Sequence, residues 1–135
     1  MNIVNWDISL SVGIDKIDDQ HKWLIDLINK LHENINCKSE DLINRSIIEL
    51  YQHTLTHFDD EDNLMKKYMY NGRDEHNKEH ENFRKSLNTI MSKFVRKEEY
   101  ITESTVAFLI DWFVDHVDKT DKKLGEHIRM VETHR

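Results

Sequence analysis

The stretch DDQHKWLIDLINKLHENIN, residues 18–36, decides the fold. Its apolar side chains recur at spacings of three and four residues, at Leu24, Ile28, Leu31 and Ile35. This period places them on one face of an α-helix. With Asp18 as the N-cap, we expect a helix over about 18–37. The same face carries His21, one turn ahead of Leu24, so a histidine points toward the predicted core.

Helical periodicity continues through three more segments. We expect helices over about 42–70, 74–97 and 103–118, the first two capped by Ser39 and Asp74. Because the sequence has no proline and three glycines, little interrupts these helices. We expect an irregular N-terminal arm before them and a short polar C-terminal tail, containing Gly125, after them. Four helices with short connections predict an all-α protein, an antiparallel up-down-up-down four-helix bundle.

Length and composition limit the classes of function. A chain of 135 residues with 38% hydrophobic residues fits one domain, residues 1–135. The net charge of −7 and the absence of a basic run argue against nucleic-acid binding. No apolar run approaches the roughly 20 residues that cross a membrane, so we expect no membrane insertion. Cys37 is the one cysteine, and the N-terminus lacks the regions of a signal peptide, which favours a cytoplasmic protein.

Polar residues interrupt the inward faces of all four predicted helices. They are His21, His57, Glu61, His76, His80 and His116, and Asp121 follows just beyond the last predicted helix. A buried imidazole or carboxylate without a partner costs on the order of a few kcal/mol, so this set needs a common explanation. Counted from the predicted helix ends at about 1.5 Å per residue, the set falls in one layer about 10 Å high. Such a layer suits a two-metal site better than a single ion.

The residue types narrow the choice of metal. Imidazole suits iron, copper and zinc, carboxylates can bridge two ions, and no second cysteine is present for a thiolate site. On a pair of six-coordinate irons, five histidines, two bridging carboxylates and one oxo or hydroxo bridge would fill every position except one. An open position on a reduced di-iron pair, inside an apolar pocket, suits a small ligand such as O2.

The pattern of these residues resembles the hemerythrin family, specifically the single-domain bacterial hemerythrins (bacteriohemerythrins). The matching pattern is His21, His57-x3-Glu61, His76-x3-His80 and His116-x4-Asp121. The segments VGIDKIDDQH, HFDDED and HVDKTD are also similar to signature segments of that family. The resemblance covers nearly the whole chain and implies a single hemerythrin-like domain.

The resemblance implies a protein that is not an enzyme and that binds O2 reversibly at a non-heme di-iron centre. It assigns His76, His80 and His116 to one iron. It assigns His21 and His57 to the other iron, with Glu61 and Asp121 as bridges between the two. O2 would bind end-on to the iron with two histidines and would take one electron from each iron and the proton of the bridge to become a bound hydroperoxide.

His116 and Asp121 are separated by an unusual spacing for two ligands of one site. Residues five apart are about 140° out of phase on an α-helix. If both side chains reach the metals, the last predicted helix cannot continue as an ideal α-helix through Asp121. We therefore expect it to end, or to contain a widened turn, between Asp118 and Asp121.

Three apolar residues should form the O2 pocket. Leu24, Trp112 and Phe113 lie three or four residues from a predicted ligand on the same helix face. They are also ordinary core residues, and the two interpretations are compatible. A wall that excludes water would slow oxidation of the iron and loss of the bound oxygen.

The remaining histidines and the acidic neighbours of Glu61 are expected to be structural or solvated. His53 lies one turn below the predicted layer and His32 three turns below His21. Solvent should surround the others, which are His127 and His134 in the polar tail and Asp59, Asp60 and Asp62 on an acidic face.

The same site is compatible with other functions. A di-iron oxidase or peroxidase would activate O2, but such bundle enzymes commonly use Glu-x-x-His motifs, and none supplies this site. An oxygen or redox sensor would need a separate signalling protein. A bundle could also hold zinc or iron for stability or storage. The leading interpretation is a carrier, store or local supplier of oxygen, for example to an oxygen-consuming enzyme.

Overall fold

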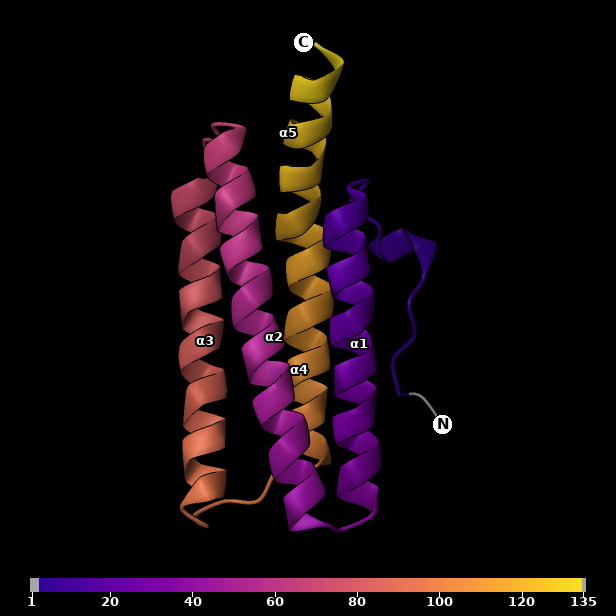
Figure 1. Cartoon of the computed structure of the whole chain (residues 1–135), viewed down its shortest axis with the longest axis vertical. Helices are drawn as coiled ribbons and strands as arrows, with labels where there is room; N and C mark the ends of the chain where they lie inside the picture. Colours follow the sequence, from indigo (N-terminus) through magenta and orange to yellow (C-terminus); the bar gives the residue numbers. More distant parts are fainter. Residues whose placement is uncertain (1–2, 135) are drawn as a thin grey trace.

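A computed structural model of the chain describes residues 3–134, and its regular elements within that range are all helices (Figure 1). A short 3-10 turn in the N-terminal arm precedes the long helices. The helices are α1 (Asp15–Asn36), α2 (Glu40–Lys67), α3 (Arg73–Val95), α4 (Glu103–His116) and α5 (Lys122–Thr133). A π-helical segment, Val117–Asp121, joins α4 to α5 without a break in the helical column.

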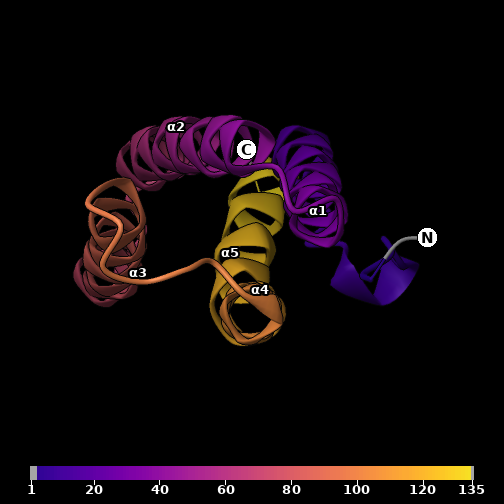
Figure 2. The ribbon, with the colours of Figure 1, turned by 90° about the horizontal axis from the view of Figure 1, so that it is seen from below.

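The helices form an antiparallel up-down-up-down bundle, as the sequence predicts. In Figure 1, α1 and α2 are joined at the bottom, α2 and α3 at the top, and α3 and α4 at the bottom again. The view from below in Figure 2 shows α2 between α1 and α3, with the α4–α5 column opposite α2. Their apolar faces meet in one core, which includes the fully buried Leu31, Ile47, Leu87 and Val106. No helix among residues 3–134 is long and apolar enough to span a membrane.

Two of the three predicted helix caps differ from the structure. Ser39 caps α2 as predicted, because its side chain accepts a hydrogen bond from the Leu42 N–H. Asp74 lies inside the first turn of α3, where Gly72 is the N-cap. Asp18 is likewise not the N-cap of α1, which begins at Asp15 after Ile14.

Asp18 instead fastens the N-terminal arm to the bundle. Its carboxylate is buried and accepts hydrogen bonds from the Ser11 hydroxyl at 2.6 Å and from the Val12 N–H at 2.9 Å. An ionised acceptor makes these bonds stronger than neutral ones. The arm therefore packs against the start of α1.

The prediction of a polar C-terminal tail is wrong, because residues 122–133 form α5. Leu124 and Ile128 lie four residues apart and are buried, so this helix covers the top of the core. His127 is correspondingly half-buried rather than solvated, and its Nε2 donates to the Tyr68 carbonyl at 2.7 Å. His134 is exposed, as predicted.

Gly125 allows α5 to touch the N-terminal arm. A Cβ atom at this position would lie 2.1 Å from the Val12 carbonyl oxygen, far inside van der Waals contact. One turn further along α5, the Arg129 guanidinium donates to the same carbonyl at 3.1 Å. The backbone of the arm therefore lies directly against α5, a contact that only glycine permits at position 125.

We expect Gly125→Ala to destabilise the protein by about 1–3 kcal/mol, because the added methyl group forces the arm away from α5. Urea unfolding at matched metal content measures the change. The control is Glu126→Ala at the exposed neighbouring position, which should leave the free energy of unfolding nearly unchanged. Equal stabilities of the two variants would contradict the close packing of arm and helix.

Candidate metal centre

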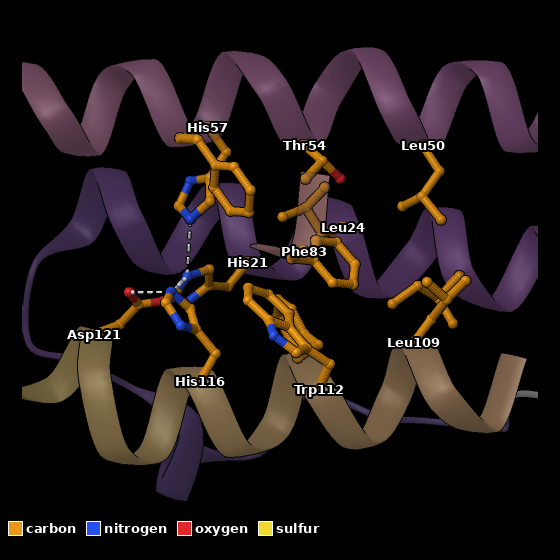
Figure 3. Close-up of a pocket in the computed structure, with 13 residues that line it drawn as sticks. His21, Leu24, Leu50, Thr54, His57, Phe83, Leu109, Trp112, His116 and Asp121 are labelled. Carbon is orange, nitrogen blue, oxygen red and sulfur yellow. Dashed lines mark hydrogen bonds and ion pairs between the residues drawn. The ribbon is translucent and has the colours of Figure 1, made fainter. Parts of the chain in front are cut away.

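The structure brings all the predicted polar residues together in the bundle interior. Each of them is at most 5% exposed: His21, His57, Glu61, His76, His80, His116 and Asp121. They come from α1, α2, α3 and the α4–α5 column, and Figure 3 shows four of them converging between these helices. The assignment of these residues as metal ligands stays a prediction, but their placement in one buried cluster is observed.

The π-helical segment explains how residues five apart reach one site. It adds a residue to the helical turn between His116 and Asp121, which rotates Asp121 onto the face of His116. The His116 Nε2 atom lies 3.1 Å from the Asp121 Oδ1 atom. The expected widened turn before Asp121 is therefore confirmed.

The side-chain atoms divide into two groups that share both carboxylates. One group contains Glu61, His76, His80, His116 and Asp121, and the other contains His21, His57, Glu61 and Asp121. Within each group, one donor atom per residue lies within 4.8 Å of all the others. This division has the form of two adjacent metal positions joined by two carboxylates.

Asp121 faces both groups with different oxygens. Its Oδ2 atom lies 3.0 Å from the His21 Nε2 atom, and its Oδ1 atom lies 3.1 Å from the His76 Nε2 atom. Each carboxylate oxygen is thus directed at a different group. A carboxylate in this position can bridge two cations.

The chemistry of the donors fits cations at this site. None of the four oxygens of Glu61 and Asp121 has a hydrogen-bond partner among the described residues. Leaving buried charged acceptors unpaired costs more than about 1–3 kcal/mol each. The ring nitrogens also crowd together, with Nε2 atoms 3.1 Å apart in His21 and His57 and 3.0 Å apart in His80 and His116. Lone pairs that converge on shared points are those of a metal-ligand set.

Electrostatics within the cluster keep the carboxylates ionised. Burial would raise the pKa of Asp121, but His116 and the neighbouring imidazoles hold it well below its usual value. Burial and Asp121 would likewise raise the pKa of Glu61, and the surrounding histidines lower it to about 2. Two negative charges therefore share the interior, a condition that favours bound cations.

The histidines respond to these charges in different ways. Burial lowers the pKa of His57 to about 4, so its imidazole is neutral and can donate a lone pair to a metal. Burial would lower the pKa of His76 as well, but Asp121 and Glu61 raise it to about 10. Without a metal, a proton on His76 thus offsets part of the carboxylate charge, and a metal ion has to displace it.

A small apolar cavity adjoins the cluster (Figure 3). Its volume is about 20 Å³, enough for one molecule of the size of water. The predicted pocket residues Leu24, Trp112 and Phe113 all line it. So do His21 and His57 of the two-histidine group, whereas His116 is the only histidine that it touches in the other group.

Sequence reasoning missed several residues that shape this cavity. Phe58 lines it and stacks on the His80 ring with centroids 3.7 Å apart. Thr54 and Leu50 line it one and two turns before His57 on α2, and their spacing was the signal that could have found them. Phe83 and Leu109 also line the cavity, one turn after His80 and two turns before His116, so the same spacing marks them.

Three other residues that could have been metal ligands, His53, His32 and Asp62, belong to neither group of donors. His53 packs on Trp23 with ring centroids 4.1 Å apart, and His32 lies 3.5 Å from the Glu103 carboxylate. Asp62 is turned toward α3, where it accepts hydrogen bonds from Arg73 at 2.7 Å and Asn77 at 2.8 Å. It is therefore a cross-helix partner rather than part of a freely solvated face.

Comparison with known proteins identifies the family of the chain. Residues 12–128 match the model of the hemerythrin HHE cation binding domain. The bacteriohemerythrin of Methylococcus capsulatus is 29% identical over 93% of this chain and 96% of its own. That of Pseudomonas aeruginosa is 31% identical over 92% of this chain and 80% of its own. The myohemerythrin of Riftia pachyptila is 30% identical over 87% of this chain and 88% of its own.

Solved structures agree with the sequence relatives. A crystal structure of wild-type hemerythrin superposes with a TM-score of 0.89 at 28% identity, over 92% of this chain and 96% of that chain. The matched domain covers most of the chain and includes every residue of the cluster. The protein belongs to the hemerythrin family.

Metal binding at the shared carboxylates should stabilise the protein. At a free metal concentration of about 100 times Kd, the folded state gains about 2.7 kcal/mol, which raises Tm. Because Glu61 belongs to both groups of donors, Glu61→Gln should lose most of this metal-dependent increase. Differential scanning calorimetry with and without Fe(II) or Zn(II), under anaerobic conditions for iron, measures it.

The matched control is Asp62→Asn, which removes the neighbouring carboxylate outside both groups. It should lower the Tm of the metal-free protein through loss of the Arg73 contact but keep the increase on metal addition. Equal increases in wild type and Glu61→Gln would show that metal binds elsewhere.

Proposed function

We propose that this protein binds O2 reversibly at a non-heme di-iron centre and acts as a carrier, store or local supplier of oxygen rather than as an enzyme. The observation that carries the proposal is the position of the cavity. It touches both histidines of the group with fewer histidines but only one histidine of the other group, and most of its other lining residues are apolar. A small apolar molecule in this cavity would therefore lie beside the metal position with fewer protein ligands.

The proposed metals are two iron ions, held by the residues of the two donor groups. His76, His80 and His116 would hold one iron and His21 and His57 the other, with Glu61 and Asp121 shared. Reduced iron would supply the electrons and the coordination position for O2. End-on binding of O2 as hydroperoxide is part of this proposal and follows the family resemblance.

The protein's own contribution is to keep the cavity dry and the ligands in place. The Phe113 ring contacts His21 edge-on at 5.3 Å, and Leu24 lies one turn along α1 from the same histidine. Trp112 stacks on His116 at 4.4 Å. These apolar walls exclude water from the cavity, which slows both the oxidation of the metals and the escape of reduced oxygen.

The donor set favours reversible binding over oxygen cleavage. It contains five imidazoles and two carboxylates, whereas bundle enzymes that activate O2 commonly use a carboxylate-rich set. We propose a cytoplasmic location, with an oxygen-consuming enzyme as the recipient of O2. An oxygen or redox sensor acting on a separate signalling protein, or an oxidase or peroxidase, is the alternative use of the same site.

Optical spectroscopy tests the proposal directly. The iron-loaded, anaerobically reduced protein should hold two irons per chain, as the two donor groups require. A visible charge-transfer band should appear with O2 and vanish when O2 is removed, over repeated cycles. Irreversible oxidation without such a band would favour the oxidase or sensor alternative, and failure to bind iron would refute the proposal.

Opening the cavity wall should speed autoxidation. In Leu24→Ala or Phe113→Ala, the lost side chain admits water next to His21, so the oxygenated protein should lose its bound oxygen as peroxide and leave the ferric protein several-fold faster. This rate change corresponds to a barrier lower by about 1 kcal/mol. The decay of the charge-transfer band measures the rate.

The control for the cavity wall is Leu31→Ala. Leu31 is fully buried on α1, the helix that carries Leu24, but it does not line the cavity. It should lower the stability of the protein while leaving the autoxidation rate close to that of wild type. If all three variants autoxidise at the wild-type rate, the cavity does not protect the metals.

A further inference from the structure

The outward-facing nitrogen of His116 has a charged partner on α3. Its Nδ1 atom lies 3.0 Å from the Glu79 Oε1 atom, a distance at which Nδ1–H donates to the carboxylate. Its Nε2 atom faces the donor cluster on the other side of the ring. The Glu79 side chain is 46% exposed, whereas that of His116 is 3% exposed. Glu79 thus reaches the buried ring from the surface of the bundle.

The π-helical segment holds the Glu79 carboxylate in place. Thr120 lies in this segment and donates its hydroxyl to the carboxylate, with both oxygens 2.9 Å away. His116 and Thr120 therefore hold one carboxylate from two points of the same column. A long side chain on the surface of a helix would otherwise sample several rotamers.

No other histidine of the cluster has an anionic partner on its outward nitrogen within the described part of the chain. The His57 Nδ1 atom donates to the neutral Gln20 amide at 2.6 Å. The Nδ1 atoms of His21, His76 and His80 make no hydrogen bond to residues 3–134. The negative charge therefore acts on one imidazole of the three-histidine group alone.

We propose that Glu79 is a charged positioning residue for the metal bound by His116, an inference that rests on the proposed di-iron function. It orients the ring and keeps the proton on Nδ1, so that the Nε2 lone pair points into the cluster. Its charge makes the imidazole a stronger donor and favours the higher oxidation state of that metal. The other metal position has no such charge on its histidines, since the His57 Nδ1 atom donates to the neutral Gln20 amide. The two metal positions therefore differ electronically as well as in histidine number.

Two substitutions separate orientation from charge. Glu79→Ala removes both, so the ferrous protein should lose iron to a chelator at least about tenfold faster, which is the usual effect of removing such a partner. Glu79→Gln keeps an acceptor for the His116 Nδ1–H but removes the charge. It should retain iron better than Glu79→Ala, and it should favour the reduced form by up to about tenfold, or about 59 mV for a one-electron step.

Chelator competition under anaerobic conditions and spectroelectrochemical titration are the two measurements. Thr120→Val should shift both quantities in the same direction as the Glu79 variants, by less. The controls are Glu81→Ala and Glu81→Gln, two residues along α3, where the carboxylate binds Arg84 at the surface. They remove the same charge from the same helix, at a carboxylate that is bonded to Arg84 rather than to a histidine ring.

The inference is supported if Glu79→Ala releases iron faster than Glu81→Ala and Glu79→Gln raises the potential above that of Glu81→Gln. It is overturned if either difference is missing. Its failure is distinct from failure of the proposed function. A wild-type protein that binds no iron, or that oxidises irreversibly, refutes the O2 proposal, whereas iron binding and O2 cycling that are insensitive to Glu79 refute only the positioning role.

Discussion

The structure depends on two carboxylates placed where a protein can rarely hold a charge. Glu61 and Asp121 are fully buried, and their oxygens make no hydrogen bond to the described residues, although imidazole nitrogens lie 3.0–3.1 Å from them. Hydrophobic burial alone would expel them or neutralise them. Five imidazoles surround them, and a pair of metal ions would complete the balance of charge. The bundle can thus be described as a scaffold that brings one histidine or more from each of α1, α2, α3 and α4 to these two residues.

The π-helical segment is the clearest case of local structure that serves this constraint. A regular α-helix is the lower-energy choice for a run without proline or glycine, and it would turn Asp121 about 140° away from His116. In this chain the turn before Asp121 is π-helical and therefore wider. The α5 helix continues from it and buries Leu124 and Ile128 against the core. Packing on both sides of the irregular turn holds it in place, and the same turn sets Thr120 opposite Glu79.

Helical period and residue type predict the bundle and six of the seven cluster residues, because these share the phase of the apolar faces; Asp121 is out of phase and reaches the cluster through the π-helical turn. His57 and Glu61, or His76 and His80, share a face with apolar neighbours whatever the partners are. The α5 helix was missed because polar residues outnumber its four apolar residues, although Leu124, Ile128 and Val131 recur at helical spacing. Caps and supporting contacts were missed for another reason. Asp18 binding Val12, or Phe58 stacking on His80, depends on how separate segments pack, which no single period encodes.

The contrast between residues placed by helical period and contacts between separate helices also explains why the two halves of the cluster differ. Ligand residues are set by helix periodicity and so could be similar on both sides, but the partners of their outward nitrogens come from a neighbouring helix. Gln20 on α1 meets His57, and Glu79 on α3 meets His116. Gln20 is in turn held by Asp60, so a charge is present near His57 but one residue removed from the ring. Both histidines line the cavity, but His57 has a neutral amide on its outward nitrogen whereas His116 has a partly exposed carboxylate. In the proposed di-iron centre, this difference would act on one metal more than on the other.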